Sequence, residues 1–70
     1  MLRQVVQSSS LLSIGYDRTT ATLEVEFANG GVYRYAGVPP ELWSAFRQSE
    51  SKGKFFQDNV RDIFATTRVS

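Results

Sequence analysis

The segment from residue 22 to 35 constrains the fold more than any other, because it has the pattern of a β-hairpin. Apolar and polar residues alternate from Thr22 to Phe27, which is typical of a strand with one buried face. The turn sequence Asn29-Gly30-Gly31 follows, and a second strand, Val32-Tyr33-Arg34-Tyr35, comes directly after it. The chain is therefore predicted to be built on an antiparallel pair of strands near its middle.

The length of the hairpin loop decides which face of the sheet the tyrosines occupy. A two-residue loop would turn Arg34 toward the core, where an unpaired charge is unfavourable. A three-residue loop with Gly30 left-handed instead turns Tyr33 and Tyr35 inward and sets Arg34 opposite Glu24 on a solvent-exposed face. We predict the longer loop. Its pairs are Leu23 with Tyr35, Glu24 with Arg34, and Val25 with Tyr33.

The flanking segments supply one more strand and two helices. Leu12, Ile14 and Tyr16 alternate with small residues, which predicts a strand before the hairpin. A helix is expected from Pro40 to about Ser49, because proline suits the first turn of a helix. A second helix follows, and its expected buried stripe is Phe56, Val60, Ile63 and Phe64.

These elements predict an α+β fold: an antiparallel three-stranded meander in the order β-β-β-α-α, with two helices packed on one face. Residues 1–70 form a single domain, in which residues 1–10 and 66–70 are expected to be loose ends, although Val5 and Val6 can add a short strand. The sequence leaves the oligomeric state open.

The composition excludes several classes of function. The 70 residues contain no cysteine and no histidine. A structural zinc site then lacks its usual ligands, and a catalytic dyad or triad lacks its base. We therefore expect no enzyme, no metal and no cofactor. The absence of cysteine favours a cytoplasmic protein, and no apolar run is long enough to span a membrane.

From about Ser9 to Arg61, the chain resembles the KTSC family, a short domain found alone in bacterial and phage proteins and at the C-terminus of some lysyl-tRNA synthetases. The segments that carry the resemblance are Ser13–Asp17, Leu23–Phe27, Tyr33–Tyr35, Val38-Pro39, Ser51–Gly53 and Asn59–Arg61. The central Tyr33-Arg34-Tyr35 looks like the Y-x-Y motif of the family. The resemblance implies RNA binding, with RNA or tRNA as the partner. Asp62 departs from the more basic tails of the family, which weakens that implication.

Tyr33, Arg34 and Tyr35 form the first candidate site. Aromatic side chains and an arginine on a sheet stack bases and contact phosphate in proteins that bind single strands. The alternative follows from the predicted register, in which both tyrosines join the edge of the core and Arg34 pairs with Glu24. Alternating aromatic residues on a strand are usually core residues, which favours the alternative.

Lys52, Gly53 and Lys54 form the second candidate site, with two interpretations. If Ser51 caps the second helix, these residues occupy its first turn, where lysine opposes the helix dipole and glycine weakens the helix. Exposed N–H groups flanked by lysines would then form a phosphate site. If the first helix continues to Lys52, Gly53 is instead its left-handed C-terminal residue. The sequence does not decide between the two.

Arg61 and Trp43 complete the candidates. Arg61 can add a cation to the same basic surface, but pairing with Asp58 or Asp62 is the commoner arrangement for an exposed helical charge. Trp43 lies at the edge of the apolar stripe of the first helix and is a candidate anchor for a protein partner. In a domain this small we expect the tryptophan to join the core.

Two functions remain. The first is an RNA- or phosphate-binding accessory domain, and the alternative is a module that binds a larger protein or self-associates through an open sheet edge. The net charge is only +1, with 8 basic and 7 acidic residues, so no broad basic surface is indicated. Basic side chains clustered on one face would favour RNA, whereas dispersal among acidic residues would favour a protein partner.

Overall fold

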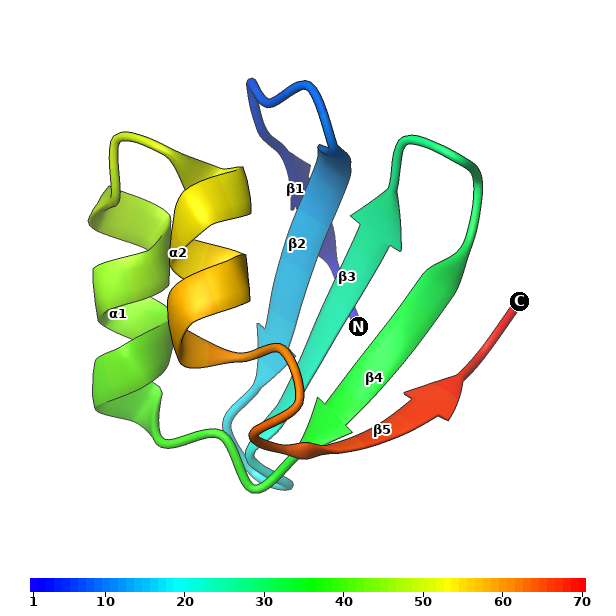
Figure 1. The fold of residues 1–70 in the computed structure, drawn as a ribbon. Helices are drawn as coiled ribbons and strands as arrows, with labels where there is room; N and C mark the ends of the chain where they lie inside the picture. Colours follow the sequence, from blue (N-terminus) through cyan, green and yellow to red (C-terminus); the bar gives the residue numbers. More distant parts are fainter.

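The computed structural model describes residues 1–70 as a five-stranded antiparallel sheet with both helices on one of its faces (Figure 1). The strands lie side by side in chain order, and the helices are inserted between the last two of them. The α+β class is confirmed, and the predicted three-stranded meander is the centre of a larger sheet. The elements are β1 (Arg3–Val5), β2 (Leu11–Asp17), β3 (Thr22–Phe27), β4 (Val32–Ala36), α1 (Pro40–Gln48), α2 (Lys52–Asn59) and β5 (Ala65–Arg68).

The hairpin between β3 and β4 has the predicted register. Leu23 pairs with Tyr35, Glu24 with Arg34 and Val25 with Tyr33. Gly30 has a φ of 96°, and the Phe27 N–H donates to the Gly31 carbonyl oxygen at 2.8 Å, which closes the three-residue loop. A residue with a Cβ is strained at such a positive φ, so the glycine fixes the loop and the loop fixes the register.

Two strands lie in residues 1–10 and 66–70, which were predicted to be loose, although a short strand at Val5 and Val6 was allowed for. Every residue of β1 and β5 is exposed, so neither strand has the alternating burial that marks a strand in a sequence. Both are edge strands held by pairing with a neighbour: β1 pairs with β2, and β5 pairs with β4. The prediction that these segments are loose is therefore wrong for the residues in β1 and β5. Pairing through the backbone alone produces no hydrophobic pattern in the sequence.

The start of β2 also differs from the prediction. Leu12 was expected to face the core, but its side chain is 43% exposed, and Leu11 is the buried residue at 1%. A β-bulge lies between Leu11 and Ser13, where the register against β3 shifts by one residue. The bulge turns Leu12 outward, because an extra residue in one strand reverses the alternation of faces.

Helix α1 begins where it was predicted to begin, and the start of α2 matches one of the two interpretations that the sequence left open. Pro40 occupies the first turn of α1, and the Ser49 hydroxyl donates to the Phe46 carbonyl oxygen at 2.8 Å at its end. Ser51 caps α2, since its Oγ accepts the Lys54 N–H at 3.3 Å. Neither helix is long and apolar enough to cross a membrane.

The predicted stripe on α2 is wrong at its far end. The helix ends at Asn59, and Ile63 lies beyond it with 59% of its side chain exposed. Asp62 has a φ of 61°, a left-handed conformation that aspartate tolerates better than most residues. This conformation breaks the helical spacing and directs the chain toward β5. Ten buried residues form the core: Leu11, Ile14, Leu23, Val25, Tyr35, Val38, Trp43, Phe46, Phe56 and Val60.

Glu24 lies on the opposite face of the sheet and is not solvent-exposed, contrary to the prediction. Its side chain is only 8% exposed, because two arginines cover it. Arg3 Nη1 donates to Oε2 at 3.0 Å, and Arg34 Nε donates to Oε1 at 2.8 Å. Gly15 lets Arg3 cross β2, since a Cβ there would lie 2.9 Å from Arg3 Cγ and 2.6 Å from the Leu2 carbonyl oxygen.

We predict that Glu24→Gln lowers the free energy of unfolding by about 1–3 kcal/mol, because two charge-assisted hydrogen bonds in a buried site lose their anion. Urea unfolding followed by circular dichroism measures the loss. Glu26→Gln is the matched control: Glu26 is 31% exposed and 4.0 Å from Arg3 Nη2. Equal losses for the two variants would show that the buried pair adds nothing beyond ordinary surface charge.

Candidate functional site

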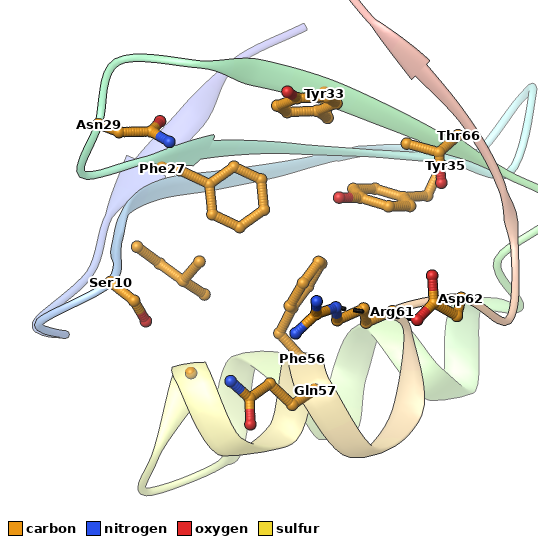
Figure 2. Close-up of a pocket in the computed structure, with 12 residues that line it drawn as sticks. Ser10, Phe27, Asn29, Tyr33, Tyr35, Phe56, Gln57, Arg61, Asp62 and Thr66 are labelled. Carbon is orange, nitrogen blue, oxygen red and sulfur yellow. Dashed lines mark ion pairs between the residues drawn. The ribbon is translucent and has the colours of Figure 1, made fainter.

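A groove opens on the helix-covered side of the sheet, between α2 and the β3–β4 hairpin (Figure 2). Its volume is about 500 Å³. Segments far apart in the sequence form its walls, including the start of β2, the hairpin, α2 and β5. The lining residues are Ser10, Leu11, Phe27, Asn29, Tyr33, Tyr35, Gly53, Phe56, Gln57, Arg61, Asp62 and Thr66.

Four aromatic rings form a connected wall of the groove. Phe27 contacts Tyr33 and Phe56 edge-to-face, with ring centroids 5.6 and 5.2 Å apart. Tyr35 contacts Phe56 in the same manner at 5.4 Å. Phe27 and Tyr33 are only half-buried, so part of each ring is open to a ligand. A flat, unsaturated group fits such a wall better than an aliphatic chain does, because it can stack on the exposed ring faces.

Two arginines flank the aromatic wall. The Arg68 guanidinium carbon lies 5.6 Å from the centre of the Tyr33 ring, within the range of a cation–π contact. Arg61 Nε lies 3.8 Å from Asp62 Oδ2, and its guanidinium extends toward Phe56 (Figure 2). The Arg61 side chain is 63% exposed. The groove therefore combines an apolar wall with cations that solvent and ligands can reach.

Tyr35 brings a polar group into the same space. Burial, reinforced by the neighbouring Tyr33, raises the pKa of the Tyr35 hydroxyl to about 12. The hydroxyl therefore stays protonated at neutral pH and can donate a hydrogen bond. The Tyr16 hydroxyl, by contrast, donates to the Val38 carbonyl oxygen at 2.5 Å and is committed to the fold.

The structure brings together four of the predicted site residues. Tyr33, Tyr35, Gly53 and Arg61 line the groove. Arg34 does not: it points to the opposite face of the sheet, where it pairs with Glu24. Tyr35 belongs to the core, which agrees with the alternative interpretation of this strand. Tyr33 is half-buried and more exposed than Tyr35.

The first turn of α2 contains Lys52, Gly53 and Lys54. Of the two interpretations, the one in which Ser51 caps a helix that begins here is therefore confirmed. Each of these residues has a structural role. Lys52 Nζ donates to the Ser49 carbonyl oxygen, and Lys54 Nζ lies 3.1 Å from Asp58 Oδ2. A Cβ on Gly53 would lie 2.8 Å from Ser10 Oγ, so glycine lets the helix start pack closely against that serine.

The start of α2 also borders a second hollow, which is entirely polar. Its lining residues are Gln7, Ser8, Ser9, Ser10, Glu50, Ser51, Lys52, Gly53, Lys54 and Gln57. Ser10, Gly53 and Gln57 line both hollows, so the polar one adjoins the aromatic groove.

Trp43 lies away from the groove, on the side of α1 that packs on the sheet. It is only 9% exposed and stacks on Tyr16 with ring centroids 5.4 Å apart. Arg47 lies over the indole, 5.6 Å from the ring centre. The tryptophan is thus part of the core, as expected for so small a domain, and little of it is available as an anchor.

Sequence reasoning missed several groove residues. Phe27 and Phe56 were assigned to the core, Asn29 to a turn, and Thr66 and Arg68 to a loose tail. The sequence did contain one indication for Phe27. It lies on the same inward face of its strand as Leu23 and Val25, which pair with Tyr35 and Tyr33. The contribution of β5 carried no signal, because all its residues are exposed.

Comparison with known proteins places these features in a family. A model of the KTSC domain matches residues 7–64. A KTSC domain protein from Yersinia pestis has a similar structure, with a TM-score of 0.96 and 39% identity, over 99% of this chain and 97% of that one. An uncharacterised protein of Stutzerimonas stutzeri is 50% identical over 56 residues, which are 80% of this chain and 79% of that protein. A lysine–tRNA ligase of Nostoc punctiforme is 31% identical over 64 residues, 91% of this chain but 11% of the ligase.

We predict that stability falls at alkaline pH because of Tyr35. The unfolded chain loses this proton near the ordinary pKa of 10.0, whereas the folded chain holds it to about 12. The folded state therefore binds more protons between these values, and stability present below pH 10 is lost as the pH rises toward 12. Urea unfolding at a series of pH values measures the slope. Tyr35→Phe should flatten the slope, whereas Tyr33→Phe should reduce it only in part, because burial is the larger cause of the shift. A slope unchanged by Tyr35→Phe would contradict the assignment.

Proposed function

The chain belongs to the KTSC domain family, and from this premise we propose that it is a non-catalytic module that binds single-stranded RNA in the aromatic groove. The observation that carries the proposal is the groove itself, in which the half-buried ring of Tyr33 lies beneath the Arg68 guanidinium while Arg61 lines the opposite wall. Proteins that bind single strands stack bases on such rings and use arginine for the backbone.

The relatives support the same assignment. Lysine–tRNA ligases contain a segment similar to this chain as a small part of their length. A domain joined to such a ligase is held near tRNA, so even a weak affinity for RNA would be effective there, because tethering raises the local concentration. We carry this role over to the present chain as a proposal.

The distribution of charge limits how much RNA backbone the domain can contact. Arg3 and Arg34 are neutralised by Glu24 on the far face, and Lys54 is paired with Asp58. Near the groove, Arg61 and Arg68 remain accessible for phosphate. We therefore propose a contact of one or two nucleotides rather than a long track, with a logarithmic salt slope of only about −0.7 per phosphate.

A protein-interaction module is the second candidate, and the same charges favour it. Basic side chains are dispersed among acidic partners rather than gathered on one face, which is typical of a surface that binds protein. In this case the groove would hold an aromatic side chain of the partner, and binding would change little with salt.

The decisive experiment is a titration of nitrogen-15-labelled protein with a short single-stranded RNA and then a bacterial tRNA, at low and at physiological salt. We predict amide shifts at Asn29, Tyr33, Gln57, Arg61 and Arg68 that weaken modestly as salt rises. Tyr33→Ala should weaken binding about 5- to 100-fold, the usual effect of losing one stacked base.

Arg47→Ala is the matched control, because Arg47 also lies over an aromatic ring but outside the groove. It should leave RNA affinity unchanged. A spectrum that does not move at low salt, where charge attraction is strongest, would contradict RNA binding. If tRNA shifts the amide signals of the Tyr33→Ala variant as much as those of the wild-type protein, the contact lies elsewhere on the domain.

A further inference from the structure

One end of the groove presents a hydrogen-bond donor with a fixed direction. Asn29 Oδ1 accepts the Gly31 N–H at 3.0 Å, so the carbonyl of this side chain is used to close the hairpin turn. The amide must then present its NH₂ group on its other side, because a side-chain amide has one oxygen and one nitrogen. Figure 2 shows that nitrogen turned toward Phe27 and the interior of the groove. The turn chemistry therefore orients a donor at the aromatic wall.

The other end of the groove presents a donor beside an acceptor. Arg61 approaches Asp62 through Nε, at 3.8 Å from Oδ2, which leaves its terminal NH₂ groups for a ligand. Asp62 is the one carboxylate that lines the groove, and its oxygens accept hydrogen bonds only. The left-handed conformation of Asp62 holds this pair at the end of α2, with Thr66 close by (Figure 2).

The four RNA bases differ in how they meet these groups. Guanine and uracil carry a carbonyl oxygen, O6 or O4, where adenine and cytosine carry an amino group. They also carry a ring N–H beside that carbonyl, where the amino bases carry a bare ring nitrogen. The Asn29 NH₂ group would meet an acceptor on a keto base but another donor on an amino base. Asp62 does not separate the two classes, because its carboxylate accepts equally from the ring N–H of a keto base and from the amino group of an amino base.

We propose that the groove selects the keto bases, uracil and guanine, over cytosine and adenine, with Asn29 as the main determinant. This inference rests on the proposed function, since it assumes that a base occupies the groove. Selection arises because a keto base accepts a hydrogen bond from the Asn29 NH₂ group, whereas an amino base presents a second donor to it.

The test compares tetranucleotides that differ only at this edge of the base: uridine with cytidine, and a single inosine with a single adenosine. We expect wild-type protein to bind the keto member of each pair about 5- to 10-fold more tightly, the effect of one well-placed hydrogen bond. Fluorescence anisotropy of labelled RNA, or the amide shifts of the groove residues, measures both affinities.

Asn29→Asp is the informative variant. The aspartate keeps an oxygen for the Gly31 N–H, so the turn is retained, but it replaces the NH₂ donor with an acceptor. The preference should disappear or reverse toward cytidine and adenosine. The added negative charge lowers affinity for every RNA, so the ratio within a pair is the readout. Gln48→Glu adds the same charge at the exposed end of α1 and should leave the ratio unchanged.

The outcomes separate the two proposals. Equal affinity for both members of each pair would overturn the keto preference and leave RNA binding in the groove intact. A preference that persists in Asn29→Asp would overturn the role of Asn29. Failure of every oligonucleotide to bind at low salt would overturn the proposed function, and the selectivity with it.

Discussion

Two arginines on one buried carboxylate organise this sheet. Glu24 of β3 accepts from Arg3 of β1 and Arg34 of β4, so a single side chain ties together three strands, one of which is not its neighbour. The contact also protects the hairpin register. A slip of one residue would turn Arg34 toward the helices and both tyrosines toward solvent, because successive side chains point to opposite faces. The groove therefore depends on an ion pair on the other side of the sheet.

This arrangement gives the two faces different properties. One face uses its cations internally, against Glu24 and, more loosely, Glu26, while Ser13 donates to Glu26 at 2.9 Å. The helices lie over part of the other face (Figure 1), and the groove opens on that face beside α2. A net charge of +1 describes this molecule poorly, since Arg3, Arg34 and Lys54 are paired with acidic residues whereas Arg68 lies over an aromatic ring of the groove. Where a charge lies thus matters more for binding than the total.

The parts of the fold that the sequence predicted are those with local physical causes. The Asn29-Gly30 turn and the Pro40 helix start each act within a few residues, and each was placed correctly, while the Ser51 cap was one of two alternatives that the sequence left open. The sequence offered β1 only as an optional strand at Val5 and Val6 and gave no sign of β5, because the residues of both strands are all exposed and their pairing uses backbone groups common to every residue. The bulge at Leu12 could not be predicted either. Leu11 and Leu12 are adjacent, and either one can be the buried residue at the start of the strand. The residues that line the groove lie as far apart in the sequence as Ser10 and Thr66. They can be identified as neighbours only when the complete topology of the sheet and helices is known.

Two residues break local rules near the groove, and they do so for different reasons. Gly53 weakens the first turn of α2, but the close approach of Ser10 explains it as packing, so it is not by itself a sign of function. Asp62 adopts a positive φ with its side chain 92% exposed, where no tight contact requires it. The consequence of that conformation is positional: in the turn that follows α2, it directs the chain into β5 and leaves Arg61 beside the Asp62 carboxylate at the mouth of the aromatic groove. The left-handed conformation therefore serves the fold, because it turns the chain into β5, and the same turn sets Arg61 and Asp62 at the edge of the groove.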